Sequence, residues 1–158
     1  PVTCNGLTVC AALTRKGSGY RGLVEKRGGL QSNSWGMITE NAANAMKFEI
    51  GDPPSANVVD TVIDETPSIY CMVNGAGNAI QTFVNGQLAS TVMGSTLTGA
   101  NSQPLLVGAR YNYAGSYHGQ IGEVVVAVKD ASTAERRITE CYLASKYSIP
   151  LAAGVICP

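Results

Sequence analysis

Carboxylates and a single histidine are the residues of this chain whose types could support catalysis. Hydrolysis of a glycosidic bond needs two carboxylates placed across the scissile bond. Asp60, Asp64 and Glu65 form the closest carboxylate cluster in the sequence, and we interpret them as solvated turn residues. His118 is the sole histidine, and no neighbouring residue would orient it as a general base. The sequence therefore predicts that this protein is not an enzyme.

The same side chains do not predict a metal site. Calcium takes about six to eight oxygen ligands, usually including several carboxylates. The spacing of Asp52, Asp60, Asp64 and Glu65 matches no calcium loop, and His118 has no histidine or cysteine partner. We therefore expect neither a bound metal nor any other cofactor.

A tyrosine-rich segment contains the residue types best suited to binding. Tyr111, Tyr113 and Tyr117 fall within seven residues, and Asn112 and His118 add polar side chains. Tyrosine offers a flat apolar face and a hydroxyl, which suits both sugar stacking and protein contacts. Two interpretations remain open: the segment packs on its own domain, or it forms a contact surface.

The five cysteines predict free thiols. An odd number without a Cys-x-x-Cys spacing is not typical of a disulfide framework or a zinc site. Cys10 and Cys71 lie in strand patterns and Cys141 on the expected inner face of a helix, so buried thiols are expected. Cys4 and Cys157 are the one pair that we would test, because both lie near the chain ends. We therefore expect synthesis in a reducing compartment.

Composition and charge limit the classes of partner that this protein is expected to bind. Charged residues make up 14% of the chain, and 11 basic residues balance 11 acidic ones. A net charge of zero gives no electrostatic reason to bind nucleic acid or an anionic membrane. No stretch predicts a membrane span, and the first residues lack a signal-peptide pattern. The opening Pro1 fits either removal of an initiator methionine or a processed fragment. A local basic run is interpreted as solvated loops; it consists of Arg15, Lys16, Arg21, Lys26 and Arg27.

The hydrophobic pattern predicts short strands. They are expected at 7–14, 20–26, 35–39, 45–50, 58–63, 68–73, 79–84, 87–93, 104–109 and 121–128. Asn85-Gly86 lies between alternating apolar positions and is a strong hairpin signal, because both turn residues must take positive φ. Trp35, the only tryptophan, is expected to be a core anchor.

One helix is predicted after the strands, over 132–147. Ser132 and Glu135 form a capping box, which satisfies two backbone amides at the helix start. Pro150 follows and marks its end. One apolar stripe is predicted to pack on the sheets; it comprises Ala134, Ile138, Cys141, Tyr142 and Ser145.

Short strands with frequent turns are typical of a sandwich. Neither a linker nor a repeat is visible. We therefore expect residues 1–158 to form a single all-β domain, a two-sheet antiparallel jelly-roll sandwich with one C-terminal helix.

The order of the segments supports this expectation further. They are 7–11, 20–26, 68–70, 83–88, 105–108, 119–124 and 134–147. This order resembles the laminin-G-like branch of the concanavalin A-like lectin and glucanase superfamily, as found in phage and bacterial surface proteins. The resemblance implies a jelly roll that works in binding or assembly.

The chain also departs from that family. The members usually begin with one more strand before the one at Leu7. They commonly have an acidic residue that helps hold calcium where this chain has Gly122. The Glu-x-Asp-x-x-Glu pattern of the related glucanases is absent. Residues 111–120 are similar to the Tyr-x-Lys-x-Gly-x-Tyr-x-Gln strand of alginate lyases, but Tyr113 replaces the lysine.

The segment after the helix is apolar and uncharged, with Leu151, Val155 and Ile156 as its largest side chains. Such a segment left in water would favour aggregation, so we expect it to be covered. Either its own sheet covers it, in place of the missing first strand, or an adjacent subunit does.

Two functions remain as hypotheses. The first is a virion structural protein, a capsid decoration or a fibre component. It would be made in the host cytoplasm and contact other virion proteins and further copies of itself. The second is a lectin-like, carbohydrate-binding module at a cell surface, which would use the 111–118 loop to bind glycans. Low charge and the missing edge strand favour assembly.

Overall fold

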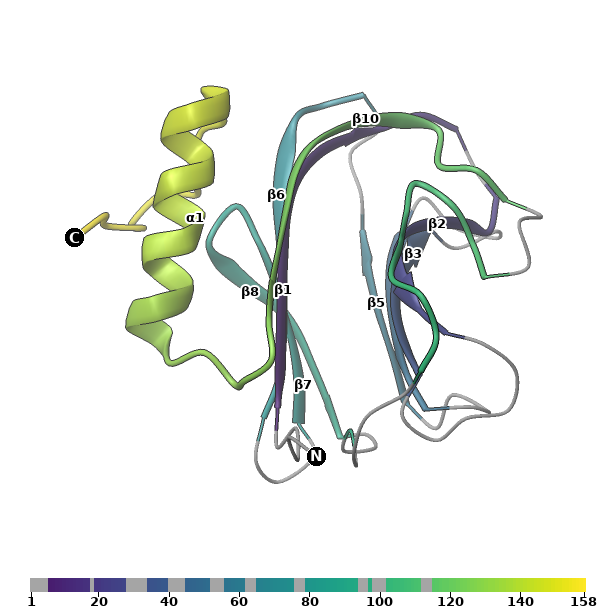
Figure 1. Cartoon of the computed structure of the whole chain (residues 1–158). Helices are drawn as coiled ribbons and strands as arrows, with labels where there is room; N and C mark the ends of the chain where they lie inside the picture. Colours follow the sequence, from purple (N-terminus) through teal and green to yellow (C-terminus); the bar gives the residue numbers. More distant parts are fainter. Residues whose placement is uncertain are drawn as a thin grey trace.

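The computed structural model describes residues 6–17, 19–27, 34–39, 45–51, 56–61, 65–75, 79–93, 97, 102–111 and 115–158. In that part of the chain, two five-stranded antiparallel sheets face each other, and one helix covers the outer side of one sheet (Figure 1). Sheet A has the order β10-β1-β6-β7-β8, and sheet B has the order β5-β4-β3-β2-β9. The prediction of an all-β jelly-roll sandwich with one long helix is confirmed.

Every predicted strand is present, but three differ in their bounds by more than one residue: the strand predicted at 58–63 lies at 56–61, that predicted at 104–109 has only two residues, and that predicted at 121–128 lies at 119–127. The strands are β1 (Leu7–Arg15), β2 (Arg21–Lys26), β3 (Trp35–Thr39), β4 (Ala45–Ile50), β5 (Ala56–Thr61), β6 (Ser68–Asn74), β7 (Ala79–Val84), β8 (Gln87–Met93), β9 (Leu106–Val107) and β10 (Gly119–Ala127). Asn85 and Gly86 both have positive φ, at 48° and 84°, as the hairpin between β7 and β8 requires.

Strand β1 is buried on both faces, because it lies inside two cores. Val9 and Ala11 point into the core between the sheets, where Trp35 is also buried. Cys10 and Ala12 alternate with them and point into a second core between sheet A and the helix. This position explains why nearly every residue of β1 is buried.

The helix α1 (Thr133–Tyr147) begins as predicted, with Ser132 as its N-cap and Glu135 completing the capping box. The predicted packing face is wrong. Its buried residues are Arg136, Glu140 and Leu143, whereas Ile138 and Tyr142 are exposed. A charge pair, rather than the apolar stripe, faces the sheet.

That buried pair sits above sheet A. Arg136 Nη1 donates to Glu140 Oε1 at 2.5 Å, and the Arg136 guanidinium lies 3.5 Å from the Phe83 ring centroid. Arg137 Nη1 lies 3.4 Å from the second Glu140 oxygen. Burial raises the pKa of Glu140, against the lowering effect of these two cations.

A β-bulge shapes β10 where the helix ends. The register with β1 runs from Ala12 opposite Glu123 to Leu13 opposite Ile121, so Gly122 is the extra residue. A Cβ on Gly122 would lie 2.7 Å from the Tyr147 ring. The Tyr147 ring of the helix therefore occupies the space that a side chain at position 122 would need.

The expectation of free thiols is wrong for four cysteines. Disulfides join Cys10 to Cys71 and Cys141 to Cys157. Cys10 and Cys71 lie directly opposite each other on β1 and β6, which their sequence separation of 61 does not reveal. The proposed pairing of Cys157 with Cys4 is also wrong, because Cys157 is bonded to Cys141.

Two further expectations from the sequence concern membrane spans and the basic run. Within the described residues, no helix is long and apolar enough to cross a membrane. The basic run is only partly solvated: Lys16 is exposed, but Arg15 and Arg27 are buried. The interpretation of the whole run as solvated loops is therefore wrong, and Arg27 leads to the candidate site.

Candidate functional site

Charged side chains gather on the outer face of sheet B, the face turned away from the core. On β4, Met46, Phe48 and Ile50 point into the core, so Lys47 and Glu49 point outward. The register aligns Glu49 with Gly36 and Gly36 with Glu25. A Cβ on Gly36 would lie 2.9 Å from Glu25 Cγ, so the missing side chain gives Glu25 room to cross the sheet.

Ion pairs form two neighbouring groups here, Arg27 and Lys47 with Glu49, and Arg110 with Glu25. Together they make up the charged cluster, which consists of Glu25, Arg27, Lys47, Glu49 and Arg110. Arg27 Nη1 pairs with Glu49 Oε2, and its Nη2 donates to the Gly51 carbonyl oxygen at 3.1 Å. Lys47 Nζ lies 3.5 Å from Glu49 Oε1. Arg110 Nε lies 3.4 Å from Glu25 Oε1, and Glu25 Oε2 accepts the Tyr111 backbone amide at 2.9 Å.

Two tyrosine rings lie over this cluster. The Tyr20 ring centroid is 5.5 Å from the Arg110 guanidinium and 5.8 Å from Lys47 Nζ. The Tyr111 ring centroid is 5.7 Å from Arg110 and 5.9 Å from Arg27. Tyr20 is 42% exposed and Tyr111 37% exposed. The rings therefore form the accessible part of the site, and the charges lie beneath them.

Among the described side chains, the cluster has an excess of positive charge, because three cations face two carboxylates. Glu25 is fully buried. Burial is the largest influence on its pKa and raises it, although the Tyr111 amide and the Arg110 and Arg27 guanidiniums act in the opposite direction. Protonation of Glu25 would increase the positive excess. The site can thus attract an anion and can stack flat rings.

The raised pKa of Glu25 predicts a dependence of stability on pH. A carboxyl that titrates higher in the folded state contributes stability that is fully present below its unfolded pKa, near 4.5. That contribution is lost as pH rises through the folded pKa. Urea unfolding of a Glu25→Gln variant between pH 4 and 8 should therefore lack part of the decline that the unaltered protein shows.

Glu65→Gln is the matched control, because Glu65 is an exposed glutamate outside the cluster. It should follow the unaltered protein at every pH. A Glu25→Gln curve parallel to that of the unaltered protein would contradict the prediction.

The residues of the predicted contact loop have different surroundings in the structure. Tyr111 belongs to the site described above. Tyr117 packs against the core between the sheets, and its hydroxyl donates to the Thr14 carbonyl oxygen at 2.9 Å. Burial raises the pKa of Tyr117. His118 is exposed. Asn112 and Tyr113 lie outside the described residues.

Of the carboxylates singled out in the sequence, the structure describes only the side chain of Glu65. Glu65 is exposed and lies 3.7 Å from Lys16 Nζ, as expected for a solvated turn. Asp52 and Asp64 lie outside the described residues, and only the backbone of Asp60 is described. No group of three or more potential metal-binding side chains occurs among the residues that the structure describes.

The tail after the helix does not form a strand of either sheet, so of the two covers considered, replacement of the first strand does not occur. Leu151 packs against the core beneath the helix. The Ala152 amide donates to the Asn85 carbonyl oxygen at 2.8 Å, and Val155 lies beside Gly86. Ile156 remains exposed. The tail therefore covers the β7–β8 turn, and the Cys141–Cys157 disulfide holds its end.

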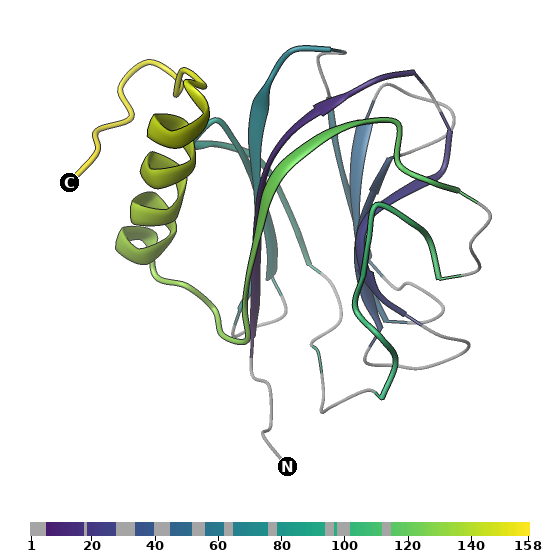
Figure 2. The same cartoon turned by 45° about the horizontal axis from the view of Figure 1, so that its top comes forward.

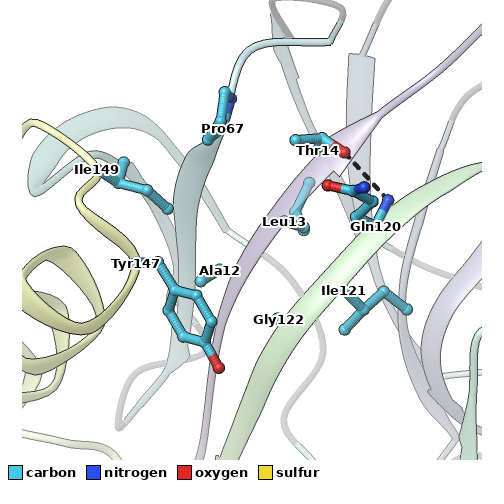
Figure 3. A pocket seen from close by; sticks show the side chains of 9 residues that line it. All are labelled: Ala12, Leu13, Thr14, Pro67, Gln120, Ile121, Gly122, Tyr147 and Ile149. Carbon is cyan, nitrogen blue, oxygen red and sulfur yellow. Dashed lines mark hydrogen bonds between the residues drawn. The ribbon is translucent and has the colours of Figure 1, made fainter.

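A hollow lies where the end of α1 meets the bulge in β10 (Figure 3). This pocket of about 350 Å³ is lined mainly by apolar groups, including Leu13, Ile121, Tyr147 and Ile149, and by no charged side chain. The pocket is concave but has no charged side chain that could bind a polar ligand. The charged cluster is therefore the better candidate site.

Comparison with known proteins leaves the family open. Neither a family model nor a curated protein matches this chain. Solved structures are similar in fold. The CBM40 domain of Ruminococcus gnavus IT-sialidase, solved bound to α2,3-sialyllactose, has 13% identity and a TM-score of 0.64 over 82% of this chain and 79% of that one.

Two longer proteins contain a similar domain. A Bacteroides ovatus protein, named as a candidate carbohydrate-binding protein, has 14% identity and a TM-score of 0.63 over 85% of this chain and 41% of that one. A structure of botulinum neurotoxin type C, from work on its entry through two ganglioside molecules, has 11% identity and a TM-score of 0.63 over 88% of this chain and 36% of that one. At these low identities, the TM-scores show a shared β-sandwich fold.

Proposed function

We propose that this chain is a glycan-binding module that holds acidic sugars at the charged cluster on sheet B. The observation that carries the proposal is the pair of half-exposed tyrosines, Tyr20 and Tyr111, above buried charges with a positive excess. A sugar ring would stack on a tyrosine face. Its carboxylate would approach the cations.

The roles within the site follow from accessibility. Arg110 and Lys47 keep 15% of their side chains exposed, so they can reach a ligand oxygen. Arg27, Glu25 and Glu49 are buried beneath them and fix their positions through ion pairs. Tyr20 and Tyr111 bind, Arg110 and Lys47 attract the anion, and the buried residues orient them.

The structural neighbours support this choice over the virion role. The Ruminococcus gnavus domain is solved with sialyllactose, and the neurotoxin structure concerns gangliosides. Sialic acid carries a carboxylate, which matches the positive excess of the cluster. No neighbour described above supports a virion role, a virion location or a laminin-G-like identity. These remain predictions from the sequence, as does the absence of enzymatic activity.

Isothermal titration calorimetry with 3′-sialyllactose and with lactose tests the proposal. We expect binding of sialyllactose that weakens with added salt, and much weaker binding of lactose. Tyr111→Ala and Tyr20→Ala should each reduce the affinity by about tenfold, because each removes a stacking face. Lys47→Met should reduce the preference for the acidic sugar.

Tyr142→Ala is the matched control, because Tyr142 is a comparably exposed tyrosine on the helix, and it should bind like the unaltered protein. Equal affinity for lactose and sialyllactose would overturn the acidic preference while leaving glycan binding in place. Failure to bind any member of a broad glycan array would overturn the proposed function.

A further inference from the structure

One carboxyl of the charged cluster lies directly beneath the groups proposed to hold an acidic sugar. Glu25, on β2, is 0% exposed, and both of its oxygens contact the segment that follows β9. In Figures 1 and 2 this segment, drawn in green, turns outward on the side of sheet B that faces away from sheet A and the helix. Glu25 therefore lies between the sheet and the accessible part of the site.

The two oxygens of Glu25 have unequal partners. Oε2 accepts the Tyr111 backbone amide at 2.9 Å, whereas Oε1 lies 3.4 Å from Arg110 Nε. Among the described residues, neither Oε1 nor Arg110 Nε makes a hydrogen bond. The Arg110 guanidinium keeps 15% of its side chain exposed. A ligand carboxylate that approaches Arg110 from solvent therefore competes with Glu25 for one cation.

The other charged groups near Glu25 compensate its charge less directly. Arg27 follows Glu25 on the same segment but pairs with Glu49, which also faces Lys47. Glu49, on β4, is a second negative charge near Glu25, and Gly36, on β3 between them, contributes no side chain. Burial and the Glu49 charge both raise the pKa of Glu25, against the lowering effect of the amide and the guanidiniums. Glu25 is thus the carboxylate of the cluster with fewer cation partners.

We propose that Glu25 makes the binding of acidic sugars at this site depend on pH, with an affinity that rises as Glu25 takes up a proton. The inference rests on the proposed function. When Glu25 is ionised, a sugar carboxylate at Arg110 meets a like charge beneath the guanidinium. When Glu25 is protonated, the Arg110 charge is left uncompensated and attracts the ligand more strongly. Oε2 can still accept the Tyr111 amide, so the segment keeps its position.

Isothermal titration calorimetry of the full chain with 3′-sialyllactose tests the inference between pH 8 and pH 4.5, the ordinary glutamate value. The affinity should increase by at least about fivefold over this range, the lower end of typical couplings between two sites. The sialic acid carboxyl is a stronger acid than glutamate and stays ionised throughout. Because coupling is reciprocal, binding should also take up protons, detected as a heat that changes with the ionisation enthalpy of the buffer.

Glu25→Gln removes the titrating group and keeps an oxygen that can accept the Tyr111 amide. At pH 8 it should bind 3′-sialyllactose as tightly as the unaltered protein does at pH 4.5, without the pH dependence or the proton uptake. A misfolded variant would lose affinity, so a gain cannot come from misfolding. Glu65→Gln and His118→Gln are the controls, because both residues are exposed and outside the cluster. Both should keep the pH dependence of the unaltered protein.

The outcomes separate this inference from the proposed function. Equally tight binding of 3′-sialyllactose across the pH range would overturn the inference and leave the proposed function in place. A folded Glu25→Gln variant that keeps the pH dependence would overturn it as well, as would loss of that dependence in His118→Gln. Absence of 3′-sialyllactose binding at every pH would contradict the acidic-sugar site itself, and the inference would fall with it.

Discussion

Replacement of both Cys10 and Cys71 by alanine is expected to lower the free energy of unfolding by about 4 kcal/mol, measured by urea denaturation without reductant. The disulfide joins residues 61 positions apart, so its removal gives the unfolded chain a large gain in entropy. It also lies in the core beneath α1, against Leu143. The variant should therefore lose stability in the helix as well as in the sheets.

The second disulfide provides the comparison. Cys141 and Cys157 are 16 positions apart, so their joint replacement should cost less, about 3 kcal/mol in the same model. The end of the chain would be released while the sandwich stays intact. A greater loss for this pair than for Cys10 and Cys71 would contradict the assignment of the main covalent constraint to β1 and β6.

Removal of one member of the buried pair in α1 is expected to have an effect of similar size. Glu140→Leu should destabilise the protein by about 3–5 kcal/mol, because it leaves the Arg136 guanidinium buried without its carboxylate. Glu140 is fully buried and Arg136 nearly so. The measurement is the urea midpoint at neutral pH, with an unchanged dependence on urea concentration.

The double variant Arg136→Met with Glu140→Leu should recover most of that loss. Burial raises the pKa of Glu140 even beside two arginines, so holding the ionised pair in the core has a cost that apolar side chains avoid. Circular dichroism confirms that the helix is retained. A double variant as unstable as Glu140→Leu would show that the pair itself, rather than the orphaned charge, stabilises the helix.

The sequence predicted the elements whose signals are local. Alternation of apolar residues located the strands, Asn85-Gly86 located a hairpin, and Ser132 with Glu135 located the helix start. Each depends on residues that are neighbours in the chain. The packing face of α1 was wrong for the same reason, because hydrophobic periodicity treats Arg136 and Glu140 as surface residues. Only the position of Phe83 and the two cations beside Glu140 make that face suitable for burial.

The candidate site depended on distant segments and was mostly missed. Tyr111 was identified, but the other members of the site were not: Glu25 and Glu49 come together only through the register of β2, β3 and β4. The sequence contained a weak signal for this site. Lys47 and Glu49 alternate with core residues on one strand, and Gly36 on the neighbouring strand leaves space for the Glu25 side chain. The disulfides were missed because an odd number of cysteines still permits two bridges and one unpaired residue.

The Cys141–Cys157 disulfide determines what happens to the molecule when its terminal segment is cleaved. Gly154 and its neighbours form an exposed turn between Ala152, bound to the β7–β8 hairpin, and Cys157, bound to the helix. Hydrolysis of a peptide bond in this turn would leave both new fragments attached, one through the main chain and the other through sulfur. A nicked molecule would keep its full mass, apart from one added water, until a reductant separated the short terminal peptide.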